Sequence, residues 1–236
     1  MTTHSDGEGA TATVTERRPL HEQWTKAGPV ESGLPAAVIQ EVQERSEAAI
    51  GEPAPMALFG FATGTLLIGI VLAGILPMDT VPATLPTLLV FAGLAQFIGG
   101  LIAYRKGNTF GATAFCSFGA NNVVVATFFL FQGAGTIAGT SNDKLLLGID
   151  LFCLCYIAVM LMIAALPING AFVLVLLALF PGYGLSAVPD VGGSDLVGHI
   201  GGWFLIVSAG LAFYTGGAIV INSSFKRTML PLFSRT

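Results

Sequence analysis

Six long apolar runs fill the chain from residue 56 onward, and short breaks with polar residues, proline or glycine separate them. The runs cover about residues 56–76, 83–104, 111–131, 145–166, 171–187 and 196–221. Each is close to the ~20 residues that a helix needs to cross the hydrocarbon core of a bilayer. Only helices or closed barrels satisfy their backbone in lipid, and these runs are too long and too apolar for barrel strands. The pattern therefore predicts an all-α membrane protein with six transmembrane helices in a compact bundle.

The charged side chains lie at or near the breaks between the runs. From Met56 to Phe225 they are Arg105, Lys106 and Lys144 together with Asp79, Asp143, Asp150, Asp190 and Asp195. A charge at the centre of a bilayer costs at least a few kcal/mol, which explains this placement. Only 10% of the chain is charged, whereas a soluble domain carries about 25% charged residues. The composition therefore excludes an ordinary soluble domain.

The chain divides into three parts. Residues 1–50 are polar and poor in aromatic residues, so we expect a mostly disordered cytoplasmic tail. Within the tail, Leu34, Val38 and Val42 have the spacing of a short amphipathic helix, and a transient helix is the alternative. Residues 51–225 form the predicted transmembrane domain, and residues 226–236 form a cytoplasmic C-terminal tail.

Basic residues near the ends of the runs predict the orientation. Arg105 and Lys106 follow the second run, and Lys226 and Arg227 follow the sixth. Because cytoplasmic loops carry an excess of Lys and Arg, we expect both clusters, and with them both termini, in the cytoplasm. The expected location is the cell (plasma) membrane.

The sequence shows no residue pattern typical of an enzyme or a cofactor site. Cys116, Cys153 and Cys155 all lie inside apolar runs, and no second pair or nearby His completes a metal site with them. We find no HExxH motif, no P-loop and no locally supported Ser-His-Asp set. The basic residues are too few and scattered for a nucleic-acid surface. We therefore expect no enzymatic activity, cofactor, metal or nucleic-acid partner.

Polar side chains inside the runs are the candidates for a transport path. Gln96 lies in the second run, Asn121 and Asn122 lie in the third, and Thr65 follows the start of the first. Buried amides need hydrogen-bond partners, so each either links two helices or faces a hydrated path. For Gln96 the two interpretations are balanced. Adjacent helical residues diverge by ~100° and do not easily share one partner, so the Asn pair favours a path.

Two ionisable residues, Asp150 and His199, lie near the outer ends of the fourth and sixth runs. Solvation at the membrane interface is the favoured interpretation. The alternative is a proton-sensitive vestibule, because His titrates near neutral pH.

Four stretches of the chain resemble one transporter family. The two prolines of Glu52-Pro53-Ala54-Pro55-Met56-Ala57-Leu58 impose a rigid, extended approach before a helix begins. This stretch resembles the Asn-Pro-Ala-Pro-Leu-Gly-Leu motif of the acetate transporter family, which includes the succinate–acetate permeases and fungal proteins linked to acetate and ammonia export. The other three matching stretches are residues 93–96 with 104–111, residues 113–119, and residues 201–203 with 225–231.

The resemblance implies a function and an assembly. It implies a hexameric ring of six-helix subunits, each with its own pore, that passes small monocarboxylates, chiefly acetate and sometimes succinate. It also implies a narrow hydrophobic constriction, whose Phe, Tyr and Leu fall on Phe61, Phe118 and Leu179 of this chain. The predicted partners are therefore a small carboxylate with or without protons, the lipid bilayer and further copies of the chain.

This chain departs from the family pattern near the implied pore. Glu52 replaces the leading Asn of the motif, Asn121 and Asn122 replace a Phe-Trp pair, and Ala218 replaces a Glu. These changes predict a wider or more polar path. Because no Lys or Arg lies in mid-span, an anion would bind weakly and leave quickly, in a passive or proton-coupled process. The alternatives are a channel for a neutral solute such as ammonia or urea, and a membrane sensor or scaffold that transports nothing.

Overall fold

The computed structural model describes residue 35, residues 37–38 and 40–42, and residues 50–234. The chain separates into two units, residues 1–50 and residues 51–236. In the first unit, residues 37–38 and 40–42 are helical, where the amphipathic helix was expected. The rest of the predicted tail lies outside the described residues, so its disorder stays a prediction.

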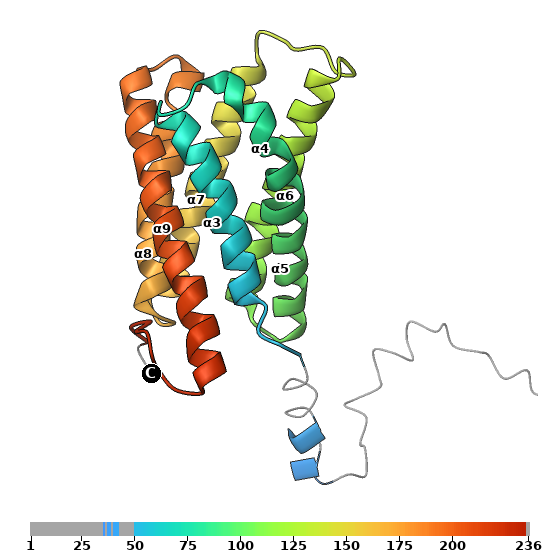
Figure 1. Cartoon of the computed structure of the whole chain (residues 1–236), viewed down its shortest axis with the longest axis vertical. Coiled ribbons are helices and arrows are strands. Elements are labelled where there is room, and N and C mark those ends of the chain that lie inside the picture. Colours follow the sequence, from blue (N-terminus) through green and yellow to red (C-terminus); the bar gives the residue numbers. More distant parts are fainter. Residues whose placement is uncertain (1–34, 36, 39, 43–49, 235–236) are drawn as a thin grey trace, which may run out of the picture. The chain divides into compact units, whose positions relative to one another are not determined.

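Residues 51–234 contain six helical segments that are long and apolar enough to span a membrane. Their bounds are Ala54–Leu72, Met78–Arg105, Thr109–Gly133, Asp143–Ala165, Gly170–Val191 and Asp195–Phe225. The first, third, fourth and sixth segments are the single helices α3, α6, α7 and α9. These helices run alongside one another as an upright bundle (Figure 1). The six predicted spans and the all-α membrane fold are therefore confirmed.

The second and fifth segments are interrupted. The second consists of a short 3-10 turn η1 (Met78–Thr80), helix α4 (Val81–Thr87), the π-helical turns of η2 (Leu88–Ala95) and helix α5 (Gln96–Arg105). Pro86 lies inside this segment and has no backbone N–H to donate, so the regular ladder breaks just before the wider π turns begin. The fifth consists of α8 (Gly170–Ser186) and the short turn η3 (Pro189–Val191).

Glycines let the helices approach closely. Helix α9 packs on both α3 and α8, and α5 packs on α6. A Cβ atom added at Gly202 of α9 would collide with the backbone nitrogen of Ala73 at the end of α3. In the same way, a Cβ atom at Gly100 of α5 would lie 2.7 Å from the backbone nitrogen of Cys116 on α6. Small residues thus permit tight helix packing at these positions.

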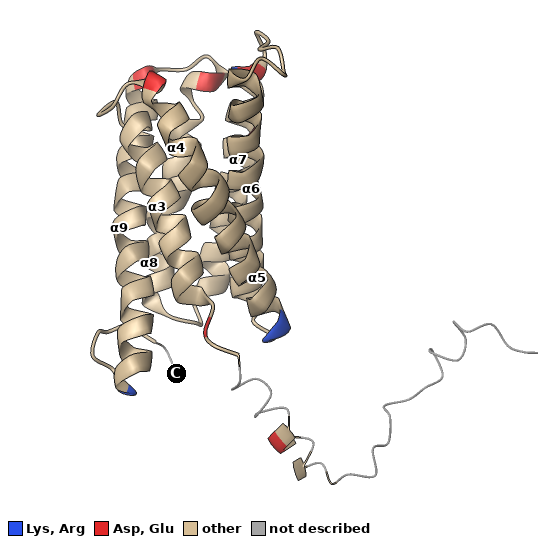
Figure 2. Ribbon diagram, turned by 45° about the vertical axis from the view of Figure 1, so that its right-hand side comes forward, with Lys and Arg blue, Asp and Glu red and all other residues tan. Residues whose placement is uncertain are grey.

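Charge is separated between the two ends of the bundle (Figure 2). Acidic residues gather at the end where α7 and α9 begin, with Lys144 among them, and Arg105, Lys106, Lys226 and Arg227 lie at the opposite end, after α5 and α9. This separation agrees with the sequence pattern from which we predicted the orientation, although the orientation itself stays a prediction.

A C-terminal hook, residues 226–234, folds back along the ends of α8 and α9. Lys226 takes a left-handed conformation with φ of 51°, which turns the chain after α9. The Asn222 side chain accepts hydrogen bonds from the backbone N–H groups of Met229 and Leu230, at 2.7 and 2.9 Å. The backbone N–H of Gly170 donates to the carbonyl of Phe233 at 3.0 Å. The hook thus ties the start of α8 to the end of α9.

Candidate transport pathway

Three helices bring the predicted constriction residues into one apolar cluster. Phe61 of α3 and Phe118 of α6 are each 4% exposed, and Leu179 of α8 is 0% exposed. The ring centroids of Phe61 and Phe118 lie 5.7 Å apart with a tilt of 41°. This tilted contact is a favourable aromatic arrangement. The two rings therefore meet, and Leu179 belongs to the same buried cluster.

Tyr183 is an aromatic residue of this region that the sequence did not single out. Its ring centroid lies 6.0 Å from that of Phe118. On α8 it follows Leu179 by four residues, so both side chains lie on one face of the helix. Phe118 lacks the hydroxyl of the family Tyr, and Tyr183 brings a phenol to the same ring. The i+4 spacing from Leu179 was the only sequence signal for this residue.

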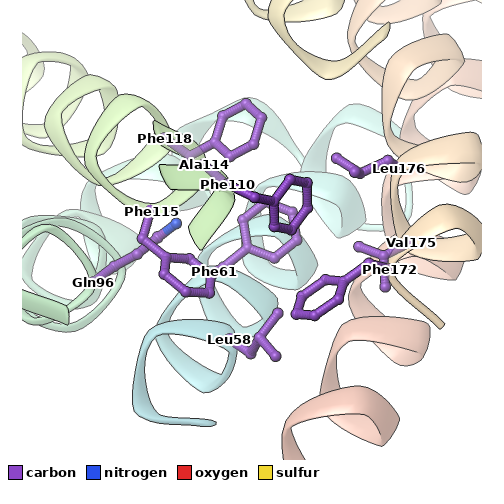
Figure 3. Close-up of a pocket in the computed structure, with 10 residues that line it drawn as sticks. All are labelled: Leu58, Phe61, Gln96, Phe110, Ala114, Phe115, Phe118, Phe172, Val175 and Leu176. Atoms are coloured by element: carbon purple, nitrogen blue, oxygen red, sulfur yellow. The ribbon is translucent and has the colours of Figure 1, made fainter. Parts of the chain in front are cut away.

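A small cavity of about 30 Å³ adjoins the constriction. Figure 3 shows its lining, which is almost entirely apolar and aromatic. The lining residues are Leu58, Phe61, Gln96, Phe110, Ala114, Phe115, Phe118, Phe172, Val175 and Leu176. A water molecule needs about 10–15 Å³ by this kind of measure, so the cavity has room for one or two waters.

Gln96 is the polar residue of this cavity. Its side chain is 0% exposed. Neither its amide nitrogen Nε2 nor its oxygen Oε1 has a hydrogen-bond partner within the part of the chain that the structure describes. A buried polar group left unpaired costs about 1–3 kcal/mol, so native proteins rarely keep one. The amide is therefore available to a water or a polar solute in the cavity.

A second aromatic pair also lines the cavity. Phe110 at the start of α6 and Phe172 at the start of α8 meet edge to face, with ring centroids 5.3 Å apart. Both line the cavity. Phe110 belongs to one of the stretches that resembles the transporter family, but its partner on α8 could not be inferred from the sequence. Two aromatic contacts thus contribute to the lining of the cavity.

The two adjacent asparagines have different partners. The side-chain nitrogen of Asn122 donates to the backbone carbonyl of Ala92 in η2 at 3.1 Å. The side-chain nitrogen of Asn121 donates to a carboxylate oxygen of Asp150 on α7 at 2.7 Å. This is the divergence expected of adjacent helical positions. Asn122 therefore contacts the π-helical turns, and Asn121 contacts an acid of the neighbouring helix.

The remaining predicted residues lie on or just before α3. Thr65 is buried and follows Phe61 by four residues, so it lies one turn further along the same face. Before the helix, the Glu52 carboxylate accepts from the backbone N–H of Ala54 at 3.3 Å and pairs with the Lys106 ammonium at 3.2 Å. The motif from Glu52 to Pro55 thus stands at the start of α3 and ties it to the end of α5. The extended approach expected of the two prolines is wrong, because Pro53 already has a helical conformation, with φ of -79° and ψ of -20°, and Pro55 lies inside the first turn of α3.

Three comparisons place this arrangement among known proteins. The succinate-acetate/proton symporter SatP of Escherichia coli strain K12 is 30% identical over 185 residues, which cover 78% of this chain and 95% of the relative. The glyoxylate pathway regulator of Yarrowia lipolytica is 29% identical over 178 residues, which cover 73% of this chain and 64% of the relative. The solved structure of the bacterial acetate channel SatP superposes with a TM-score of 0.72 at 28% identity, and covers 78% of this chain and 99% of that one.

The Escherichia coli relative is thus named as a symporter, and the solved structure with the same fold is named as a channel. The family resemblance read from the motifs is confirmed over a longer range, since the match to the family extends over residues 36–234. The chain is an integral membrane protein that belongs to the GPR1/FUN34/yaaH family.

Proposed function

We propose that this protein conducts small monocarboxylates such as acetate across the membrane. The path runs between α3, α5, α6 and α8, and Phe61, Phe118 and Leu179 form its narrowest part. The observation that carries the proposal is the buried, unpartnered amide of Gln96 in an aromatic cavity beside that constriction. The relatives that carry acetate or succinate in their names support it.

The cavity suits a carboxylate that has shed most of its water. Transfer of a charged group out of water is very costly unless hydrogen bonds replace the lost hydration. The Gln96 amide supplies an N–H donor, and the positive edges of the phenylalanine rings complement an anion. Lys and Arg are absent from the middle of the spans. The anion is therefore held weakly, which allows it to leave again, as conduction requires.

The structure corresponds to a closed path. A cavity of about 30 Å³ holds one or two waters, but acetate has four heavy atoms and needs more room. The aromatic pairs Phe61–Phe118 and Phe110–Phe172 border this cavity. Passage therefore requires at least one ring to rotate, so these aromatic side chains act as gates.

The test compares wild-type protein with Gln96→Leu in proteoliposomes. We expect initial acetate uptake to fall at least several-fold, because the hydrogen-bond donor in the cavity is lost. We also expect the substitution to raise the free energy of unfolding or leave it unchanged, since an unpaired buried amide is removed. Lower uptake from a protein of unimpaired stability assigns Gln96 to the path.

Empty vesicles and Phe152→Ala are the controls. Phe152 lies on α7 and is 43% exposed, away from the cavity lining. Wild-type uptake no greater than that of empty vesicles would sink the proposed function. Uptake that ignores both membrane potential and pH would instead assign the path to a neutral solute.

We also infer an assembly and an orientation. The family resemblance implies a hexameric ring with one pore in each subunit, and many large apolar side chains on the bundle surface are exposed to lipid or to neighbouring copies. The charge separation in Figure 2 favours a cytoplasmic position for both termini, in the cell membrane. Native mass spectrometry in detergent and labelling of cysteines introduced at the loops test the two inferences separately.

A further inference from the structure

Asp150 lies about two turns into α7, further from the end of the helix than solvation at the membrane interface would require. It follows Asp143, the first residue of α7, by seven positions, which places it about 10 Å further along the helix. It is half-buried. An ionisable group at such a depth is expensive and commonly marks an ion or proton path. Its place in the fold therefore requires a physical explanation.

The neighbours of Asp150 fix the position of its carboxylate but do not offset its negative charge. Its carboxylate accepts a hydrogen bond from the Asn121 amide, with a nitrogen–oxygen distance of 2.7 Å. Within residues 50–234, Glu52 and Lys106 form the ion pair that the structure shows. That pair lies at the opposite end of the bundle from Asp150. The Asn121 amide orients the carboxylate, but it is neutral and therefore does not offset the negative charge of Asp150. A proton is the cation that could neutralise Asp150 in place.

The other titratable groups near Asp150 do not replace that proton. Tyr183 of α8 is near enough for the charge of Asp150 to act on its phenol. Asp190 of η3 packs against Gly148 of α7, and the charge of Lys144 acts on Asp190. Asp143 is bonded to Thr140 and Gln132 instead. From α6 the group that reaches Asp150 is the neutral amide of Asn121.

The order of residues along two helices places this acid beside the gate. On α6 the sequence runs from Phe110 and Ala114 in the cavity lining, through Phe118 in the constriction, to Asn121. On α8 it runs from Phe172 and Val175 in the lining, through Leu179, to Tyr183. Both helices therefore give the same order: the Gln96 cavity, then the apolar gate, then the polar cluster of Asn121, Asp150 and Tyr183.

We propose that Asp150 is the proton-binding site of the pathway and hands its proton to the carboxylate that passes the gate. This rests on the proposed function, because it concerns how that same path carries its substrate. In the first step, Asp150 takes a proton from the water at its end of the bundle. In the second step, the arriving anion takes that proton, which leaves an ionised Asp150 and a neutral carboxylic acid. The neutral acid then crosses the rings of Phe61 and Phe118.

The chemistry of this transfer is balanced and favourable for transport. One O–H bond breaks at Asp150 and one forms on the substrate, and no charge is created. Donor and acceptor are both carboxyl groups, so the proton moves between similar sites. A neutral acid enters an apolar constriction at much lower cost than an anion. An ionised Asp150, in contrast, repels an anion, so transport without a proton is slow.

The decisive variant is Asp150→Asn, studied as full-length protein in proteoliposomes with the membrane potential clamped. In the wild type we expect initial acetate uptake, corrected for empty vesicles, to increase several-fold with an inward proton gradient. In Asp150→Asn we expect that increase to disappear, while uptake driven by membrane potential rises, because the repelling charge is gone. Asp79→Asn, the same change at an exposed acid of η1, is the matched control and behaves as wild type.

A second measurement follows the proton itself and does not need transport. Infrared difference spectra of the vesicles, recorded as pH is lowered, show the carbonyl band of a protonated carboxyl group. We expect one such band to be absent from Asp150→Asn. We expect it to shift in Asn121→Leu, which removes the hydrogen bond to Asp150 but keeps the acid.

The outcomes separate the two proposals. Wild-type uptake equal to that of empty vesicles defeats the proposed function, whereas the infrared titration still decides whether Asp150 binds a proton. A proton-driven increase that persists in Asp150→Asn overturns the proton site, and so does an unchanged infrared titration. Equal loss of acetate exchange in Asp150→Asn and Asp150→Glu assigns Asp150 to structure alone and also overturns it.

Discussion

At the scale of single residues, Gln96 and Phe61 have different roles in the candidate path: Gln96 offers a polar group, and Phe61 closes the path. Gln96 has two buried polar atoms that find no hydrogen-bond partner among the residues that the structure describes. Phe61 closes the neighbouring space by contact with Phe118. The first is costly for stability and useful for a polar solute. The second contributes apolar packing and excludes water. A path that binds weakly and is gated needs both kinds of residue.

The Phe61 side chain is the most direct test of the gate. We expect Phe61→Ala to increase acetate flux and to admit lactate, which is bulkier, because the ring contact with Phe118 is lost. The substitution also removes a buried ring, so we expect the free energy of unfolding to fall by about 3–5 kcal/mol. Uptake of both acids, measured beside Phe152→Ala, checks the prediction. Lactate exclusion as strict as in the wild type contradicts it.

Sequence and structure agree at the residue scale where a side chain belongs to a motif. The motif from Glu52 to Pro55 does mark the start of α3, although the chain is already helical at Pro53 and is not extended there as expected. Gln96 could be recognised from the sequence as a polar residue inside a span. Its lack of hydrogen-bond partners among the described residues could not be predicted, because its surroundings come from four elements, α3, α5, α6 and α8, that meet only in three dimensions. The contact between Phe118 and Tyr183 escaped prediction for the same reason.

At the scale of elements, small residues determine how closely α9 approaches its neighbours. Gly202 packs against the backbone at the end of α3, whereas Gly210, two turns further along α9, has no atom within 4 Å of the position of a Cβ. The two glycines lie on the same helix and differ in their surroundings. They therefore form a matched pair for a test of helix packing.

We expect Gly202→Ala to destabilise the bundle by at least about 1–3 kcal/mol, the usual cost of overpacking. We expect Gly210→Ala to be neutral or stabilising by up to about 1 kcal/mol, since alanine favours a helix over glycine. Thermal unfolding in detergent measures both. Equal destabilisation by the two variants would show that backbone propensity, not the contact with α3, controls this helix.

The π-helical turns of η2 are held by a side chain of another helix. Asn122 donates to the carbonyl of Ala92, one of the backbone groups of those turns. We expect Asn122→Leu to lower the free energy of unfolding by about 1–3 kcal/mol, because that carbonyl loses its partner. Amide hydrogen exchange should rise within residues 88–95 and not at the start of α8. Exchange unchanged in η2 argues against this support.

The six spans could be predicted because each is a long apolar run with charges at or near its ends. The length and polarity of such a run are set by the thickness of the hydrocarbon core, not by contacts between helices. The π turns could not be predicted in the same way. Pro86 indicates a break in the ladder, but the kind of turn that follows depends on how α6 packs beside it. The first residue of the second span was also wrong by five positions, since it begins at Met78 and not at residue 83.

At the scale of the whole molecule, the C-terminal hook joins parts of the chain that are far apart in sequence. Asn222 makes three hydrogen bonds with it, since its side chain also donates to the Leu230 carbonyl at 2.8 Å. Tyr214 donates from its hydroxyl to the carbonyl of Pro231 at 2.8 Å. The hook reaches the first residues of α8 through the backbone. The last two helices are thus fastened at one end of the bundle.

We expect Asn222→Ala to cost about 2 kcal/mol of stability, the net value of three hydrogen bonds that include two to backbone N–H groups. Ser224→Ala, a change at an exposed position two residues away, is the control and should leave stability within about 0.5 kcal/mol. Chemical denaturation followed by tryptophan fluorescence measures both variants. Identical midpoints for Asn222→Ala and wild type would show that the hook contributes nothing.

The hook also imposes an order on biosynthesis. The backbone N–H groups of Gly170 and Ala171 bond to the carbonyls of Phe233 and Leu232, which the ribosome adds some sixty residues later. Until then the start of α8 lacks those partners, even though its helix can already enter the membrane. A nascent chain interrupted before residue 232 therefore displays an unfinished α8 at the membrane surface.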